Sequence, residues 1–209
     1  MDGLDGHQFF FRGLIIGFSI AAPVGPIGVL CIRRTLANGG AIGLISGLGA
    51  ATADAIYGSI AGFGLTFISS ILVSHQLWFR IVGGVFLCYL GLTTFLAKPS
   101  QSAAAATGKG FVGAYASTFF LTVTNPLTIL SFTGIFAGLG VASPGSNYFS
   151  SLILVLGVFF GSAFWWLLLT SGVSIFRGKF SDRYLVWVNR ISGLIILAFG
   201  LVSLFIVGF

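Results

Sequence analysis

Residues 9–32 read FFFRGLIIGFSIAAPVGPIGVLCI, an apolar stretch that is long enough to cross a lipid bilayer. A membrane-spanning helix needs about 20 consecutive apolar residues. The stretch also has some features of a secretory signal that ends at the small residues Ala21 and Ala22. However, Pro23 directly after them is a poor cleavage context, and the apolar run resumes at Ile27. We therefore expect a first membrane helix that is retained and interrupted, not a removed leader.

The rest of the chain has the same character. Only 7% of the 209 residues are charged, 56% are hydrophobic, and the mean hydropathy is +1.07. A soluble domain carries about 25% charged residues, so most of this surface must face lipid. Further apolar runs cover residues 40–69, 79–97, 111–139, 149–174 and 188–209. These runs predict an all-α integral membrane protein with six transmembrane helices in a single membrane domain. The second and fourth runs exceed the hydrocarbon thickness and should tilt or break.

Basic residues predict the orientation of the chain. Eight of them fall after the first, third and fifth runs: Arg33, Arg34, Lys98, Lys109, Arg177, Lys179, Arg183 and Arg190. The opposite side holds only Arg12 and Arg80. Cytoplasmic loops of membrane proteins carry an excess of Lys and Arg, which puts both termini on the periplasmic side of a bacterial inner membrane. Topology thus accounts for the net charge of +6, and no nucleic-acid partner is predicted.

The two halves of the chain share residues at similar positions, which indicates an internal repeat. Gly13 and Pro26 match Gly113 and Pro126 at an offset of 100, Gly47 and Ala53 match Gly157 and Ala163 at 110, and Trp78, Gly84, Gly91 and Leu92 match Trp187, Gly193, Gly200 and Leu201 at 109. The pattern predicts a first repeat at 9–97 and a second at 111–209, joined by a cytoplasmic loop at 98–110. Because three spans is an odd number, the repeats must be inverted, as in many secondary transporters.

Prolines interrupt the first run of each half at Pro23, Pro26 and Pro126. Each removes a backbone donor and disturbs the carbonyl four residues earlier, which frees the carbonyls of Ser19, Ala22 and Thr122. Breaks in corresponding places of two halves point to a transporter's binding site, and a new half-helix offers free N–H groups to an anion. We therefore predict substrate-binding positions at Gly25, Pro26, Thr122, Asn125 and Pro126. A simple kink that aids packing is the alternative.

Asp54 is the only acidic residue within a predicted span. A carboxylate at the bilayer centre is costly and normally faces the interior of the bundle. The same face carries a stripe of small residues that allows helices to approach closely: Gly43, Gly47, Ala50, Ala51, Gly58 and Gly62. Asp54 is predicted either to carry a proton or to pair with a cationic group of the substrate. A structural acid held by neighbouring hydroxyls is the alternative.

Other polar and aromatic side chains give weaker signals. Thr118, Thr122 and Asn125 share one face of the fourth run, and Thr124, Thr128 and Ser131 share another. Such hydroxyls mostly satisfy local carbonyls. Trp165 and Trp166 lie deep in the fifth run, where bulk packing is the favoured explanation and a place in the wall of a substrate path is the alternative. Cys31, Cys88, His7 and His75 are too scattered for a metal site or a disulfide framework. No cofactor and no enzymatic activity are predicted.

The motif Ala22-Pro23-Val24-Gly25-Pro26, followed by Arg34-Thr35, Gly39-Gly40 and the stretch from Gly47 to Ala53-Asp54, resembles the LysE/RhtB family of amino-acid exporters. Thr124-Asn125-Pro126 looks like the signature of the second half in that family. The resemblance implies efflux of amino acids or close derivatives from the cytoplasm, driven by the proton-motive force. It also implies functional roles at Pro23, Gly25, Pro26, Asp54, Asn125 and Pro126.

These observations combine into a working hypothesis with rivals. A zwitterion would lie between the repeats, with its carboxylate at the two half-helix N-termini and its ammonium group at Asp54. One rival is export of a metal or other inorganic cation, which requires clustered ligands. A second is a membrane thiol-disulfide carrier that uses Cys31 and Cys88, and a third is a purely structural subunit. The small-residue stripes also leave a homo-oligomer open.

Overall fold

The computed structural model describes residues 3–23, 25–63, 74–96, 108–125, 128–129, 131–132, 148–177 and 182–205, and within these ranges the chain is helical without any strand. Its main helices are α1 (Gly3–Ala21), α2 (Pro26–Asn38), α3 (Gly40–Gly62), α5 (Gln76–Leu96), α6 (Gly108–Val123), α8 (Tyr148–Arg177) and α9 (Asp182–Phe205). The predicted ends of the second and fourth runs at 69 and 139, and residues 98–107 of the predicted loop, lie outside the described residues.

Four of these helices, α3, α5, α8 and α9, are long and apolar enough to cross a membrane. The pair α1 and α2 passes the same test together, with a bend of 81° between its helices, which makes up to five spans in the described part of the chain. The apolar part of α6 is shorter and covers Gly110–Val123. The expectation of an all-helical membrane protein is therefore confirmed, whereas six spans are not established by these lengths.

The first run differs from its predicted form, a single interrupted span over 9–32. Helix α1 ends at Ala21, and α2 continues to Asn38. Proline explains the restart, because Pro26 occupies the first turn of α2, where its missing N–H costs nothing. The end of α2 is set by Gly39, whose φ of 104° favours glycine over every other residue. Arg33 and Arg34, which the sequence placed in a loop, therefore belong to a helix.

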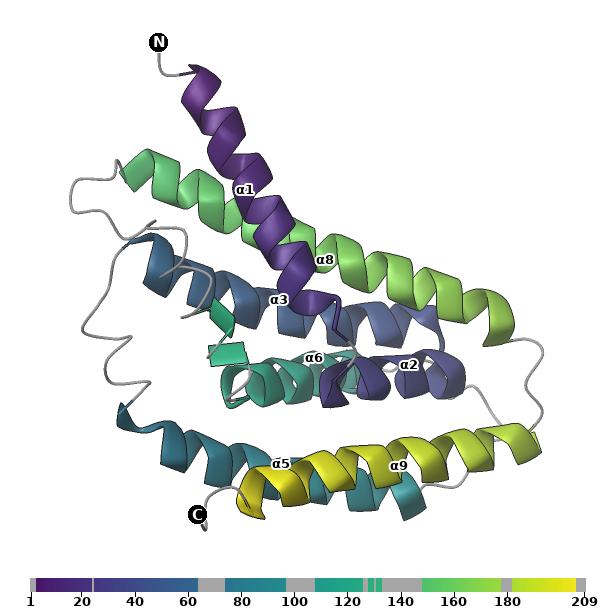
Figure 1. The fold of residues 1–209 in the computed structure, drawn as a ribbon. Coiled ribbons are helices and arrows are strands. Elements are labelled where there is room, and N and C mark those ends of the chain that lie inside the picture. The colour runs from purple at the N-terminus through teal and green to yellow at the C-terminus, as the bar shows by residue number, and fades with distance from the viewer. Residues whose placement is uncertain are drawn as a thin grey trace.

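The helices pack in four main pairings. Helix α1 packs along α8, α5 packs along α9, and α3 lies between α6 and α8. The short helix α2 fills the space between α3, α8 and α9. Figure 1 shows α5 and α9 side by side along one edge of the bundle, with α8 on the opposite side of α3. The pairs α1–α8 and α3–α6 each join the first half of the chain to the second.

Glycines allow α1 and α8 to touch backbone to backbone. Both helices carry two glycines spaced four residues apart. A Cβ on any of the four would collide with a carbonyl oxygen of the other helix: Gly13 with Leu154, Gly17 with Val158, Gly157 with Phe10, and Gly161 with Leu14. Contacts that advance together along both helices mean that α1 and α8 run parallel. This arrangement uses the small-xxx-small rule of membrane helices, in which close approach supplies the packing energy.

The pair α5–α9 is also built on glycines, but the two helices run in opposite directions. A Cβ on Gly84 would lie 3.2 Å from the carbonyl oxygen of Gly200, and one on Gly91 would lie 2.9 Å from that of Gly193. These four glycines form two of the matched pairs between the two halves of the sequence. The match of Gly13 with Gly113 is different, because Gly113 is exposed and a Cβ there would meet nothing within 4 Å.

The stripe of small residues on α3 is buried along its whole length. Much of it faces α8: a Cβ on Gly47 would strike Trp166, and one on Gly58 would lie 3.4 Å from Val158. Helices α3 and α8 can therefore approach closely around Asp54, as the stripe predicted.

Candidate functional site

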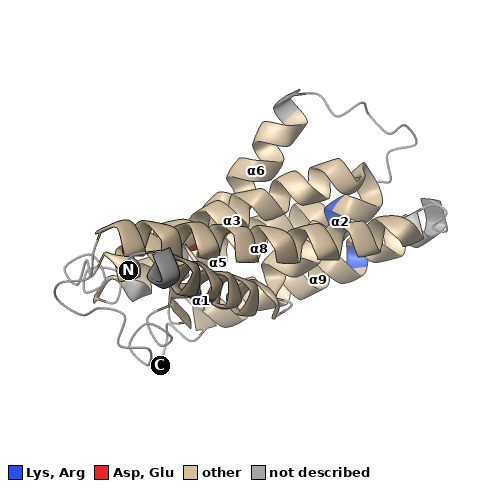
Figure 2. Ribbon diagram, turned by 90° about the horizontal axis from the view of Figure 1, so that it is seen from above, with Lys and Arg blue, Asp and Glu red and all other residues tan. Residues whose placement is uncertain are grey.

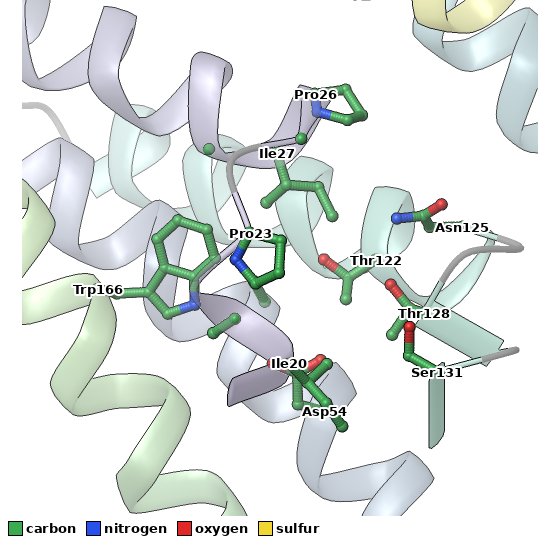
Figure 3. A pocket seen from close by; sticks show the side chains of 14 residues that line it. Ile20, Pro23, Pro26, Ile27, Asp54, Thr122, Asn125, Thr128, Ser131 and Trp166 are labelled. Atoms are coloured by element: carbon green, nitrogen blue, oxygen red, sulfur yellow. The ribbon is translucent and has the colours of Figure 1, made fainter. Parts of the chain in front are cut away.

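A cavity of about 250 Å³ lies where α1 ends and α2 begins. It is lined by residues from the broken segment, α3, the end of α6, the helical residues that follow it, and α8 (Figure 3): Ile20, Ala21, Pro23, Gly25, Pro26, Ile27, Gly28, Ala50, Asp54, Thr122, Asn125, Thr128, Ser131 and Trp166. The volume lies just below the range of about 300–1,000 Å³ typical of drug-sized ligands. It suits a small solute.

The structure brings together nearly all the positions that the sequence singled out. The described ones are Gly25, Pro26, Asp54, Thr122 and Asn125, with the helix-breaking Pro23 beside them. Pro126 lies outside the described residues. Residues that are far apart in the sequence, from both halves of the chain, therefore line the same cavity. The binding roles assigned to these residues stay predictions.

Asp54 is buried in the middle of α3, with only 3% of its surface exposed. The hydroxyl of Ser162 in α8 donates a hydrogen bond of 2.7 Å to Asp54 Oδ2. This is the hydroxyl partner that the structural alternative requires. However, among the described residues that line the cavity, Asp54 is the only one with a charged side chain. A single hydroxyl does not offset the cost of burying a carboxylate, which must take up a proton or a cation. Asp54 therefore suits both predicted roles.

The start of α2 gives the cavity a region that favours negative charge. Gly25 is the N-cap and has no side-chain cap, and the first backbone bond of the helix runs from Val29 N to Gly25 O at 3.0 Å. The first N–H groups of a helix have no partner within it, and here Pro26 has none to offer. Ile27 and Gly28 both line the cavity, and the N–H groups of the first turn of a helix favour an anion.

The second break lies at the end of α6. The helix ends at Val123, Thr124 forms a turn, and helical residues resume at Thr128. The sequence predicted a free carbonyl at Thr122, but this carbonyl accepts a hydrogen bond of 3.2 Å from Asn125 N. The carbonyl of Asn125 in turn accepts a bond of 3.2 Å from Ile129 N. A tighter turn therefore satisfies the backbone locally.

The hydroxyls in and directly after α6 donate hydrogen bonds to carbonyls of the preceding turn, as the sequence analysis favoured. Thr118 donates to the carbonyl of Ala114 at 2.5 Å, Thr122 donates to that of Thr118 at 2.8 Å, and Thr124 donates to that of Phe120 at 2.8 Å. Three hydroxyl residues also line the cavity: Thr122, Thr128 and Ser131. Local satisfaction of carbonyls and a place in the cavity wall are thus compatible.

Trp166 lines the cavity, although the sequence favoured bulk packing for it over a place in the wall of a substrate path. It is 3% exposed, and its indole N–H has no hydrogen-bond partner among the described residues. Figure 3 shows its ring projecting from α8 beside Pro23, with the nitrogen on the edge turned towards the other cavity residues. A buried Trp N–H usually finds a partner. The signal available in the sequence was its position, deep in a span and away from the interfaces where tryptophan is common.

Arg33 and Arg34 form a second polar cluster that the sequence analysis missed. Arg34 donates to Ser46 Oγ of α3 at 3.0 Å, to the carbonyl of Ala114 in α6 at 3.0 Å and to Ser117 Oγ of α6 at 2.7 Å. Arg33 donates to Asn189 Oδ1 of α9 at 2.9 Å. Figure 2 shows basic positions at the end of the bundle where α2 and α9 lie, and the acidic position in its interior. The two arginines tie α2 to three other helices.

Replacing Arg34 by lysine should destabilise the protein although the charge is kept. A lysine ammonium lacks the planar fork that reaches three acceptors at once. Hydrogen bonds to charged groups contribute about 1.5–3 kcal/mol each, so we expect the free energy of unfolding to fall by about 2 kcal/mol. Thermal unfolding of the purified protein in detergent tests this. Arg190→Lys, at an exposed position of α9, is the matched control and should leave the midpoint unchanged. Equal midpoints for both variants would remove the structural role of Arg34.

The arrangement described so far is that of a multi-pass membrane protein with a cavity between its described helices that holds a buried carboxylate, which is the general design of a membrane translocator. The family model "LysE type translocator" matches residues 18–206, and the chain belongs to this family. The sequence is 30% identical over 197 residues to "Putative amino acid efflux protein YcgF" of Bacillus subtilis (strain 168), which covers 92% of this chain and 93% of that protein. It is 25% identical over 173 residues to "Uncharacterized membrane protein slr1627" of Synechocystis sp., with 82% and 80% covered. No solved structure matches.

Proposed function

We propose that this protein is a secondary transporter of the bacterial inner membrane that exports amino acids or close derivatives from the cytoplasm. The observation that carries the proposal is the cavity, where Asp54 and the breaks of both halves line one small space. Family membership supports the translocator class. The name of the Bacillus subtilis relative supports amino acids as the substrate class.

The packing of the helices supports two inverted three-span repeats. In this scheme, α1 with α2 corresponds to α6 with the helical residues that follow it, α3 corresponds to α8, and α5 corresponds to α9. Exchanging the halves turns the pair α1–α8 into the pair α3–α6, and both pairs are in contact. It also turns the approach of Gly84 to Gly200 into that of Gly193 to Gly91, which is the second approach seen. With α6 counted as part of a span, the chain has six spans and both termini lie on the periplasmic side.

The proposed substrate pose follows from the charges around the cavity. The ammonium group of an amino acid lies at Asp54, which carries the only charge among the described lining residues. Its carboxylate lies at the start of α2, where unpaired N–H groups and the helix dipole favour an anion. The same carboxylate of Asp54 can carry a proton once the substrate has left, which would couple export to the proton gradient.

The rival functions have less support in the structure. Export of a metal cation requires a set of ligands, and within the described residues no three His, Cys, Asp or Glu side chains come together. A thiol-disulfide carrier requires cysteines that react together. Cys31 is a buried residue of α2, whereas the sulfur of Cys88 packs against Gly200 of α9. The two cysteines form no disulfide.

The proposed function is tested by efflux from cells. Cells that express the protein, and cells with the empty vector, are loaded with dipeptides so that amino acids accumulate in the cytoplasm. We expect one or a few amino acids to appear in the medium faster when the protein is present. Equal rates for every amino acid, at verified expression in the membrane, would exclude amino acids as the substrate class.

A further inference from the structure

We infer that Trp166 Nε1–H donates a hydrogen bond to a carboxylate oxygen of the transported solute, and that the cavity takes small α-amino acids with uncharged side chains. The inference rests on the proposed function and adds to it both a recognition residue and a narrower class of substrate. Three observations support the inference. The indole N–H has no hydrogen-bond partner among the described residues, α3 packs against the ring and fixes its position, and the described lining carries one charged side chain.

The indole N–H is a donor that lacks an acceptor in the described part of the protein. Only 3% of the surface of Trp166 is exposed, so bulk water does not satisfy the N–H group either. Leaving a buried donor unpaired costs free energy. Trp166 lines the cavity (Figure 3), so a solute oxygen that bound against the edge of the ring would remove this cost.

The position of the ring is fixed from the neighbouring helix. Gly47 of α3 lies directly against the Cβ and Cγ of Trp166, the latter 2.6 Å from where a Cβ of residue 47 would be. Any larger residue at 47 would displace the tryptophan. The close approach of α3 and α8 at this point therefore places the indole and Asp54, which also lies on α3, on the wall of the same cavity.

The charges of the lining limit the solute. With Asp54 paired to the α-ammonium group, an acidic side chain would find no counter-charge among the described lining residues, and a basic side chain would find none there for its second positive charge. An unpaired buried charge is strongly disfavoured. The remaining walls offer apolar groups, such as Ile20 and Ile27, and the hydroxyls of Thr128 and Ser131. Together with the volume of about 250 Å³, they suit small apolar or hydroxyl side chains.

The test compares Trp166→Phe with Trp165→Phe in proteoliposomes. Trp165 is the neighbouring residue on α8, packs against Phe18 with ring centroids 5.4 Å apart, and does not line the cavity. Counterflow of labelled serine is measured in the presence of a competitor. The competitor is either unlabelled serine or ethanolamine, which lacks the carboxylate. In the wild type and in Trp165→Phe, serine should compete far better than ethanolamine. In Trp166→Phe, the half-saturating concentration of serine should rise about 10–100-fold, while that of ethanolamine stays unchanged.

The outcomes separate the inference from the proposed function. If Trp166→Phe transports serine with wild-type affinity, or loses serine and ethanolamine by the same factor, the hydrogen bond to the carboxylate is wrong. If lysine or aspartate competes better than serine, alanine and threonine in the wild type, the restriction to uncharged side chains is wrong. If the wild type moves no amino acid at all, the proposed function itself fails.

A binding measurement keeps the inference testable even if Trp166→Phe folds poorly. The chain has four tryptophans, and the other three, Trp78, Trp165 and Trp187, do not line the cavity. Replacing these three by phenylalanine leaves Trp166 as the only indole. Serine should then shift or quench its emission, and ethanolamine should not. An emission spectrum that is insensitive to serine, in a protein that still transports it, would overturn the contact.

Discussion

Cells that carry Asp54→Asn are expected to export amino acids about 10–100-fold more slowly than cells with the wild-type protein at equal expression. Asparagine has nearly the same shape as aspartate, and its carbonyl oxygen can still accept the hydrogen bond from Ser162. It cannot become negative, so it offers no counter-charge to an ammonium group and carries no proton. The size follows from a charge-assisted contact of about 1.5–3 kcal/mol, with a factor of ten for every 1.4 kcal/mol.

The matched control is the same chemical change at Asp182, the first residue of α9. Asp182→Asn should export at the wild-type rate. Counterflow in proteoliposomes then distinguishes the two roles of Asp54. If the residue carries the proton, Asp54→Asn should still exchange amino acid for amino acid but lose export driven by the proton gradient. If it pairs with the ammonium group, both activities should fall. Normal export by Asp54→Asn would remove Asp54 from the mechanism.

Sequence features with a local physical cause were the ones that could be predicted. The prolines interrupt helices through their own missing N–H groups, so the breaks near Pro26 and Asn125 could be expected before any fold was known. A lone carboxylate on a stripe of small residues has to face the interior of the bundle, and Asp54 does. That these positions line one cavity depends on how the helices pack, which no local pattern specifies.

The features that were missed depend on contacts between distant segments. Arg33 and Arg34 follow an apolar run and therefore look like loop residues that set topology. Only the bend of 81° and the continuation of α2 to Asn38 bring them against α3, α6 and α9. The unpaired N–H of Trp166 could not be predicted for a related reason, since a tryptophan in an apolar run looks the same whether its N–H is paired or not.

The pairing of α1 with α8 should be the most sensitive part of the fold. Gly161→Val is expected to lower the unfolding midpoint of the purified protein by about 2–12 °C, because the added side chain meets the backbone of Leu14. A contact with backbone cannot be relieved by a change of rotamer. Overpacking costs about 1–3 kcal/mol, and each kcal/mol shifts the midpoint of a chain of this size by about 2–4 °C.

Gly172 provides the control on the same helix. A Cβ at this position would meet nothing within 4 Å, so Gly172→Val should leave the midpoint unchanged or raise it slightly, because valine has a higher helix propensity than glycine. Equal losses in both variants would mean that valine disturbs α8 itself. Because α1 belongs to one half of the chain and α8 to the other, the difference between the two variants measures how firmly the halves are joined at this contact. A large difference would show that the glycine contact between α1 and α8 contributes much of the stability with which the two halves are joined.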